Sequence, residues 1–416
     1  MFRKLMTLEE ARKAIANQFK PALLADEIAV LLEAYNRVLA EDAVSTLDIP
    51  PFNRSTMDGY AVKSEDTFGA DENQPAKLKV VGAVAAGEQP TLVLRKGEAV
   101  EIVTGAPIPE GADAVVMIED TEREDDDLQV FVTVAANENV MKLGADVKKG
   151  DVIFKKGQVL GSSEVGVLAA MGLTSVKVLR IPMVAVLSTG GEVTEPGKPL
   201  PPGKIYDINS YSLSTAVVEC GGKPVYFGVV PDDKAALHKA MVTALASADM
   251  VITSGGVSVG PRDYTPQIVD SLGKPGIVVC GIAVKPGKPT TIGFVGEKPV
   301  FSLPGNPTSA LLIFYLLARP IILQLAGRPL AQMKIVKAVA GAKMFSAKGR
   351  RTFVMVKLMF DDSCRLIAQP VETGAAGAIT TLAKADGFVE IPENEQFVDT
   401  NQEVAVALFR SVLGKP

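Results

Sequence analysis

The chain has 416 residues, of which 47% are apolar and 22% charged, and its formal net charge is -5 at pH 7. This length is sufficient for more than one domain, and the composition is that of an ordinary globular protein. A slightly acidic chain provides no broad positive field for nucleic acid or an anionic membrane. Any anionic ligand must therefore be held by local groups.

The cysteine and histidine content excludes two common kinds of metal or redox site. The three cysteines lie far apart, which excludes a CxxC metal or redox pair and fits a reducing compartment. The single histidine, His238, cannot build a multi-histidine zinc site. Residues 1–10 interleave charged and apolar residues and lack the apolar run of a secretory signal. We expect a cytoplasmic protein whose proton transfers use carboxylates, lysines or water.

The first third of the chain is expected to change from helix to strand. Apolar residues recur at helical spacing over 9–40, with an interruption at Pro21. From 57 to 134, short β-branched runs such as 78–81 alternate with glycine and proline, which predicts a small β-rich domain inserted into another domain. The acidic run 119–127 lies between two such strands and is expected to be a solvated hairpin loop.

Residues 181–320 have the rhythm of a parallel α/β sheet, because strand-like and helical stretches alternate. The expected strands are 183–187, 225–230, 250–253 and 300–303, and the expected helices are 210–219 and 234–247. The apolar stretch 310–318 is closed by Arg319-Pro320 and is expected to be a buried helix too short to span a bilayer. Further strand-like runs beyond Pro320 predict a C-terminal β domain.

Two loops of this region could bring backbone N–H groups close to a phosphate or another oxyanion. The first, Thr253–Gly260, follows an apolar strand and is rich in glycine and serine. The second, Leu303–Ser309, ends a strand and opens a helix, where the helix dipole favours an anion. The alternative for both is structural: a tight turn in the first, and capping by Asn306, Thr308 or Ser309 in the second.

Residues Lys285–Pro289 place two ammonium groups on a proline-stiffened turn, which suits an oxyanion, although a solvated basic turn is the alternative. The segment is not a Walker A loop. Five residues instead of four separate Gly281 from Gly287, and Pro289 replaces the magnesium-binding serine or threonine.

A serine hydrolase is a rival from another class, because residues 256–260 formally match the G-x-S-x-G nucleophile elbow. That fold supplies its histidine after the serine, whereas His238 precedes Ser258. The expected base is therefore missing from its position in the chain.

Acidic residues at turns could supply the hard oxygen ligands that magnesium prefers. They are Asp58, Asp146, Glu192 and Asp263. Each of these residues is individually typical of a turn or a helix cap. They lie far apart in the sequence, and the sequence alone does not show that they meet in space.

Taken together, these motifs resemble one family, the molybdopterin molybdenumtransferases, which include bacterial MoeA and the eukaryotic gephyrin E domain. The resemblance covers nearly the whole chain, and the motifs follow the family's order. The segments that carry it are Pro50–Phe52 through Ser55, Met57–Ala61, Thr104–Pro107, Ser188–Gly190, Ile205–Asp207, Ser254–Gly260, Lys285–Pro289 and Leu303–Pro307.

The resemblance implies an α/β multidomain subunit that forms a homodimer. The implied domains are a parallel α/β molybdopterin-binding domain at 1–26 and 181–328, an inserted β-rich domain at 48–147, a small segment-swapped α/β domain at 27–47 and 148–180, and a C-terminal β domain at 329–416. The implied reaction converts adenylylated molybdopterin and molybdate into molybdenum cofactor and AMP, assisted by a divalent cation, usually Mg2+. Transient contacts with the molybdopterin adenylyltransferase and with recipient molybdoenzymes are expected.

The resemblance also assigns roles by motif position. The residues matching family positions tied to activity are Asp58, Thr104, Asp146, Glu192, Asp232 and Asp263. Asp58, Glu192 and Asp263 are the expected magnesium ligands.

The ligand-binding set is expected to hold the pterin through Asp207 and Asn209. Lys285 and Lys288 would hold the phosphate or molybdate by charge-assisted hydrogen bonds. The remaining members are Ser188, Thr189, Gly190, Ser254, Gly255, Gly256, Ser258, Pro304, Gly305, Asn306 and Pro307.

The chain departs from the family pattern at four positions, Met141, Ala145, Gly191 and Gly281. The first two replace an arginine and a glutamate of many relatives, and Lys142 could restore the charge. Gly191 replaces an aspartate of many members, and Gly281 a basic residue of some. These losses motivate a second hypothesis, a molybdopterin-binding chaperone or scaffold with weakened turnover.

Tungstate remains an alternative to molybdate, because the two oxyanions have nearly the same size and charge.

Overall fold

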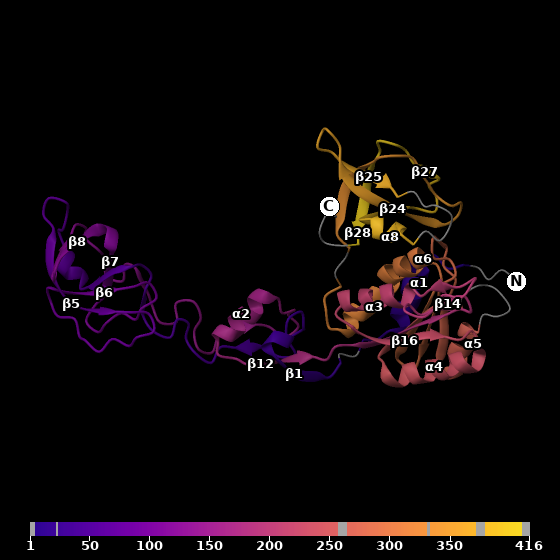
Figure 1. The fold of residues 1–416 in the computed structure, drawn as a ribbon, viewed down its shortest axis with the longest axis horizontal. Helices are drawn as coiled ribbons and strands as arrows, with labels where there is room; N and C mark the ends of the chain where they lie inside the picture. The colour runs from indigo at the N-terminus through magenta and orange to yellow at the C-terminus, as the bar shows by residue number, and fades with distance from the viewer. Residues whose placement is uncertain (1–4, 22–23, 257–263, 331–332, 372–378, 410–416) are drawn as a thin grey trace. The chain divides into compact units, whose positions relative to one another are not determined.

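The computed structural model describes residues 5–21, 24–256, 264–330, 333–371 and 379–409 (Figure 1). The chain divides into two compact units. Unit 1 comprises Met1–Glu27, Asn36–Val38 and Val178–Pro416, and unit 2 comprises Ile28–Tyr35 and Leu39–Lys177.

A six-stranded sheet with the order β16-β13-β17-β21-β20-β18 forms the centre of unit 1. Its strands are β13 (Met183–Thr189), β16 (Lys223–Val230), β17 (Met250–Ser254), β18 (Pro275–Cys280), β20 (Thr291–Val295) and β21 (Lys298–Leu303). The first four strands in this order are parallel, which confirms the expected α/β arrangement. The strand β20, which the sequence did not predict, runs antiparallel to both of its neighbours, β21 and β18. A short turn at Gly296 joins β20 to β21, and such a turn connects only antiparallel strands.

Helices cover both faces of this sheet (Figure 1). One face packs against α4 (Lys234–Ser247) and α5 (Thr265–Leu272). The other packs against α1 (Leu8–Gln18), α3 (Asn209–Glu219), α6 (Pro307–Ile313) and α7 (Arg319–Leu325). Burial on both faces explains why the central strands are continuous apolar runs.

The apolar helix continues past Pro320, where the sequence predicted its end. A π-helical turn, Phe314–Ala318, joins α6 to α7, and Arg319 N donates to Phe314 O across the widened turn. Such a turn accommodates the proline that an α-helical interior would exclude. The helical segment Pro307–Leu325 is long and apolar enough to cross a membrane, so the expectation that it is too short is wrong, but 67% of an apolar 18-residue window within it is buried. The expectation of a buried helix is therefore confirmed.

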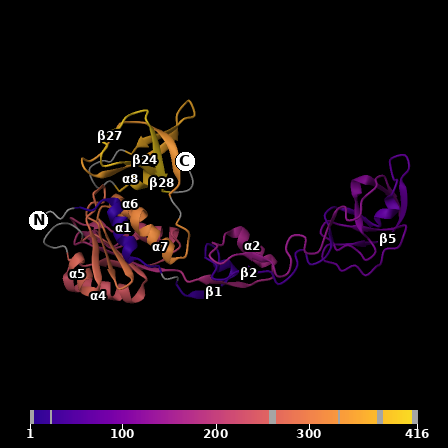
Figure 2. The same cartoon turned by 180° about the vertical axis from the view of Figure 1, so that it is seen from behind.

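A closed β-barrel follows in unit 1 and confirms the expected C-terminal β domain. Its strands are β22 (Ile335–Ala340), β24 (Arg351–Phe360), β25 (Leu366–Pro370), β26 (Gly387–Ile391) and β28 (Glu403–Leu408), and β24 pairs with both β25 and β26. The short strand β19 (Val284–Lys285) pairs with β24, which joins the barrel to the first sheet's domain. Figure 2 shows α1, α6 and α7 between the sheet and the barrel. Their core includes Phe353, Met355 and Phe388 of the barrel.

One arginine adds charged contacts to this junction. Arg351 of β24 forms ion pairs with Glu9 of α1 and with Glu390 and Glu393 of the barrel. Its side chain is only 18% exposed, whereas the three carboxylates are far more exposed. Such pairs contribute modestly to stability, but they fix the orientation of the strand that carries Arg351.

Unit 2 is mainly β, as predicted for residues 57–134. Its largest sheet has the order β7-β4-β6-β5-β9-β8. The strands are β4 (Gly59–Val62), β5 (Ala76–Val84), β6 (Glu98–Ile102), β7 (Ala114–Met117), β8 (Thr121–Glu124) and β9 (Asp127–Val130). The acidic run 119–127 is exposed, as expected, but it includes the edge strand β8 rather than only a loop.

Smaller elements complete the fold. They are β1 (Asp26–Val30) paired with β12 (Ser175–Leu179), β2 (Ala43–Val44) with β11 (Val152–Phe154), β3 (Arg54–Ser55) with β10 (Val140–Met141), β14 (Val193–Thr194) with β15 (Ile205–Tyr206), β23 (Met344–Phe345) with β27 (Phe397–Val398), and the helices α2 (Ser162–Ala170) and α8 (Thr381–Lys384).

The expectation of helix over 9–40 holds only for α1. Beyond Pro21 the chain forms β1 and a single 3-10 turn, because β-branched residues there favour strand.

The central sheet should dominate the stability of unit 1. We predict that Phe301→Ala lowers the free energy of unfolding by about 3–5 kcal/mol, because a fully buried ring is lost and a cavity is left. Phe360→Ala is the control: that ring is 69% exposed, so the change should stay within about 0.5 kcal/mol. Urea denaturation of the two variants measures both values, and equal losses would contradict the assignment of the core.

Candidate functional site

Parallel pairing gathers three strand ends of unit 1. In register, Ser188 of β13 pairs with Ser254 of β17, and Ser254 pairs with Leu303 of β21. The carboxyl ends of these strands therefore meet at one edge of the sheet, where α/β proteins bind their ligands. Thr189-Gly190, Gly255-Gly256 and Pro304-Gly305 follow directly. The structure thus brings together three segments that the sequence predicted to bind the ligand.

Asp207 lies at the same edge, just before α3. Its Oδ1 accepts hydrogen bonds from Ser188 Oγ at 2.8 Å and from Ser210 N at 3.1 Å. Ser210 Oγ also lies 2.8 Å from Ser188 Oγ. Asp207 is 4% exposed, and its Oδ2 has no hydrogen-bond partner among the described residues. A buried carboxylate oxygen of this kind is suited to accept an N–H group of a ligand.

Asn209, the first residue of α3, makes internal contacts. Its Nδ2 donates to Ser254 Oγ and to Gly305 O, both at 2.7 Å. Both amide hydrogens are therefore engaged by the protein, and the predicted pterin contact can involve only Oδ1. Like Asp207 Oδ2, this oxygen is buried and has no partner among the described residues.

The backbone at Gly255 approaches β13 too closely for any side chain. Its φ is +89°, and a Cβ atom there would lie 2.0 Å from Thr189 O. A Cβ on Gly305 would in turn lie 3.8 Å from Gly255 Cα. Glycine is therefore required at 255 by the close approach to β13 as well as by its positive φ, whereas the contact at Gly305 is an ordinary van der Waals distance.

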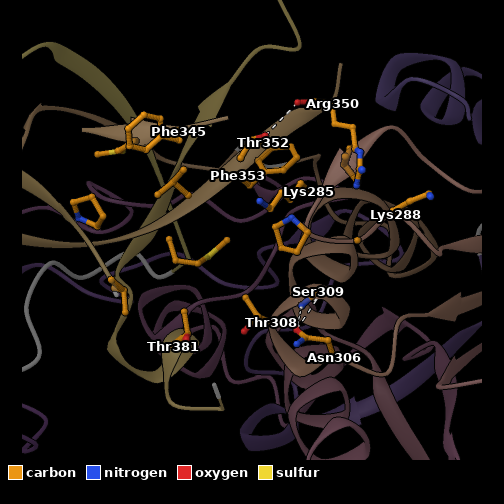
Figure 3. Close-up of a pocket in the computed structure, with 18 of the residues that line it drawn as sticks. Lys285, Lys288, Asn306, Thr308, Ser309, Phe345, Arg350, Thr352, Phe353 and Thr381 are labelled. Atoms are coloured by element: carbon orange, nitrogen blue, oxygen red, sulfur yellow. Dashed lines mark hydrogen bonds between the residues drawn. The ribbon is translucent and has the colours of Figure 1, made fainter. Parts of the chain in front are cut away.

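A pocket of about 840 Å³ lies between the start of α6 and the barrel, within unit 1. Figure 3 shows Asn306, Thr308 and Ser309 on one side and Phe345, Thr352 and Phe353 on the other. Asn306 caps α6, because its Oδ1 accepts from Ser309 N at 3.1 Å.

Four cations line this pocket: Lys285, Lys288, Lys343 and Arg350. Lys343 forms an ion pair with Asp399 at 2.9 Å, and its Nζ lies 3.6 Å from the centre of the Phe397 ring. For the other three, the described part of the chain provides no carboxylate within ion-pair distance. The pocket therefore carries positive charge that an anion could neutralise.

Sequence reasoning found the two lysines of this pocket but missed its barrel residues. Lys343 and Arg350 lie in the barrel, outside the recognised motifs, and only tertiary packing brings them beside Lys285. The pairing of Lys285 with Thr352 produces this arrangement, because β19 adds to the barrel sheet there.

In unit 2 the structure joins Asp58 and Thr104, two residues predicted to act together. Thr104 N and Thr104 Oγ1 both donate to Asp58 Oδ1, at 2.6 and 2.8 Å. The backbone hydrogen bond, followed by the hydroxyl hydrogen bond, lowers the pKa of Asp58. The shift further favours the ionised form of this exposed carboxyl group, which is the form that a metal ligand or an electrostatic group requires.

The other predicted acids are more scattered. Glu192 and Asp232 are exposed residues of unit 1, and Asp146 is an exposed residue of unit 2. Asp232 precedes Asp233, which caps α4 by accepting from Ala236 N. Asp263 and Ser258 lie outside the described residues. Among the residues that are described, no group of three or more histidine, cysteine or acidic side chains gathers to hold a metal ion. The magnesium ligands stay a prediction.

Replacing Thr104 should change the acidity of Asp58. We predict that Thr104→Val raises the pKa of Asp58 part of the way to its ordinary value, because the hydroxyl bond is lost while the larger backbone effect remains. In the native protein, the stabilisation from ionised Asp58 is present above its ordinary pKa and disappears as pH falls through the lowered one. Carboxyl-carbon NMR titration measures the shift. An unchanged Asp58 pKa would contradict the role of the hydroxyl.

Gly255 allows a second test of the strand-end geometry. We predict that Gly255→Ala destabilises unit 1 by more than the about 1–2 kcal/mol that a positive φ costs an alanine, because its Cβ would clash with Thr189 O. Gly203→Ala is the matched control, since Gly203 has a φ of +76° but nothing within 4 Å of the added atom. Thermal unfolding compares the two, and equal losses would show that the approach to β13 is looser than described.

Comparison with family models defines the class of protein. The MoeA N-terminal region (domain I and II) matches residues 6–172, a probable molybdopterin binding domain matches 185–324, and the MoeA C-terminal region (domain IV) matches 337–409. The sheet with its ligand edge falls in the second match and the barrel in the third. The chain thus has the multidomain architecture of MoeA proteins.

Full-length relatives identify the family. A molybdopterin molybdenumtransferase from Haemophilus influenzae is 35% identical over 99% of this chain and 100% of its own length. Another from Nostoc sp. is 36% identical over 91% of this chain and 88% of its own. The crystal structure of a molybdopterin biosynthesis MoeA protein from Pyrococcus horikoshii is 43% identical, with a TM-score of 0.83, and the match covers 98% of this chain and 100% of that one. The chain belongs to the molybdopterin molybdenumtransferase family.

Proposed function

We propose that the protein is an enzyme that inserts molybdate into adenylylated molybdopterin, forming molybdenum cofactor and releasing AMP. The observation that carries this proposal is the pocket of unit 1, where Lys285, Lys288 and Arg350 face the start of α6. Their charge suits a phosphate or an oxyanion, and the family relatives named above are molybdopterin molybdenumtransferases.

The two parts of unit 1 would hold different parts of the ligand. The basic pocket would bind the anionic groups by charge-assisted hydrogen bonds. The edge at Asp207 would accept N–H groups of the pterin, because Asp207 Oδ2 and Asn209 Oδ1 are buried acceptors with no partner among the described residues. Burial strengthens such hydrogen bonds, since no water competes for them.

The carboxylates would bind the metal ion and orient the groups at the reacting bond. Asp58, whose carboxylate accepts two hydrogen bonds from Thr104, fits a hard cation, and Glu192 and Asp263 are proposed as further ligands. Magnesium, when bound, would neutralise charge on the pyrophosphate linkage. Asp146 and Asp232 complete the proposed catalytic set, with roles in orienting groups at the reacting bond.

The assembly and cellular setting are also part of the proposal. We expect a homodimer in the cytoplasm that has the four domains predicted from the sequence and meets the molybdopterin adenylyltransferase and recipient molybdoenzymes transiently. Light scattering of the purified protein tests the dimer.

Two substitutions should separate chemistry from binding. We predict that Asp58→Asn abolishes turnover but leaves molybdopterin affinity nearly unchanged, because the neutral amide cannot hold the cation. Lys285→Ala should instead weaken ligand binding, since it removes a cation from the pocket. Asp125→Asn and Lys337→Ala are matched controls at exposed positions and should leave both quantities unchanged.

The assay incubates the protein with adenylylated molybdopterin, magnesium and either molybdate or tungstate, then measures AMP and metal-loaded cofactor. Oxyanion-dependent release of AMP with cofactor formation supports the transferase and reveals its metal. Tight molybdopterin binding without either product would favour the chaperone hypothesis instead. Labelling by a fluorophosphonate, abolished in Ser258→Ala, would favour the serine hydrolase.

A further inference from the structure

One side chain joins the end of β17 to the loop after β21 at the ligand edge of unit 1. Asn209 Nδ2 donates one hydrogen bond to Ser254 Oγ, at the last residue of β17, and another to Gly305 O, in the segment after β21. Both bonds are 2.7 Å long, and Asn209 is 8% exposed. The orientation of the amide follows from chemistry, because Gly305 O only accepts hydrogen bonds and the NH2 group must face it.

Among the described residues, few other hydrogen bonds tie the end of β17 to the segment after β21. The β17–β21 ladder ends where Ser254 pairs with Leu303. Beyond that pair, Ser254 Oγ donates to Pro304 O at 3.2 Å and Gly255 N donates to Leu303 O at 3.1 Å. Asn209 bonds Ser254 on one side and Gly305 on the other, so its amide extends the connection past the end of the sheet.

Asn209 lies at the start of a helix that is firmly packed in the core. It begins α3, whose buried residues Leu213, Ala216 and Val217 pack in the main core. Just before the helix, Asp207 Oδ1 accepts from Ser210 N and fixes the first turn. Because the helix already fixes the backbone of Asn209, its short side chain can hold Ser254 and Gly305 in one relative position at little cost in conformational entropy.

The second loop leads directly into the basic pocket. Gly305 precedes Asn306, which caps α6 and lines the pocket together with Ser309. The position of Gly305 therefore affects where the start of α6 lies relative to Lys288 and the other pocket cations. In the same way, the position of Ser254 affects the glycine backbone that follows it.

We propose that Asn209 is a positioning residue that clasps the end of β17 to the segment after β21 and so sets the geometry of the ligand site before the ligand arrives. This role rests on the function proposed above and differs from the pterin contact that the sequence suggested. A direct contact would act only in the complex, whereas the clasp acts in the free protein as well. Hydrogen exchange of the unliganded protein separates the two roles.

The experiment uses Asn209→Asp and Asn209→Leu, which remove the two donors at nearly constant size. Gln324→Glu is the matched control, because Gln324 Nε2 donates to a backbone carbonyl of α7 away from the site. In the free protein we expect faster exchange of the Gly255 amide, which donates to Leu303 O, in both Asn209 variants and no change in the control. Molybdopterin affinity should fall about tenfold or more, since two buried hydrogen bonds that hold the site are lost.

The pH dependence provides a signature of the clasp. In Asn209→Asp the carboxylate repels Gly305 O, but the protonated acid can donate to it, so exchange protection should recover as pH falls through the pKa of the new group. Asn209→Leu has no such group and should show no recovery. If either variant fails to fold, Ser254→Ala, which removes one arm of the clasp, should still accelerate exchange at Gly255.

Unchanged exchange in the free protein would overturn the clasp, whether or not affinity falls. Lost affinity with native exchange would assign Asn209 to direct ligand contact. Absence of molybdopterin binding by the unmodified protein would instead refute the proposed function, while the exchange of the free variants would still decide the clasp. The two proposals therefore fail in distinguishable ways.

Discussion

The parallel alignment of β13, β17 and β21 is the constraint on which the ligand site of unit 1 depends. Parallel hydrogen bonding brings Ser188, Ser254 and Leu303 into register, so three loops leave the sheet at one edge. Apolar helices cover both faces and leave that edge as the place where polar groups can reach a ligand. The close approach of Gly255 to Thr189 O follows from the same alignment.

The electrostatics of the site are local. The chain is acidic overall, with a net charge of -5, yet Lys285, Lys288 and Arg350 line one pocket. The pairing of β19 with β24 is the physical cause, since it joins a lysine-bearing turn to a barrel strand. The ion pairs of Arg351 with Glu9, Glu390 and Glu393 hold the same strand against the rest of unit 1.

Buried polar atoms at the edge divide into two kinds. Some complete the protein's own hydrogen bonds, such as Asn209 Nδ2, and these hold the loops. Others, such as Asp207 Oδ2 and Asn209 Oδ1, have no partner among the described residues. Because an unpaired buried oxygen is costly, a ligand that donates N–H groups would gain more there than at an exposed site. One residue can thus belong to both kinds through its two amide atoms.

The sequence by itself determined the alternating strands and helices of 183–303, the β-rich character of unit 2, the β character of the C-terminal domain and the segments that carry the family resemblance. Those features depend on local periodicity and on residues adjacent in the chain. Only the tertiary structure decided that β18 and β20 run antiparallel, that a π-helical turn carries the apolar helix past Pro320, and that Arg350 joins Lys285. Only the tertiary structure also decided that both amide hydrogens of Asn209 donate to the protein itself, to Ser254 Oγ and Gly305 O. Each of these outcomes depends on contacts between residues distant in sequence or on the closure of a particular turn, and neither leaves a periodic signal in the chain.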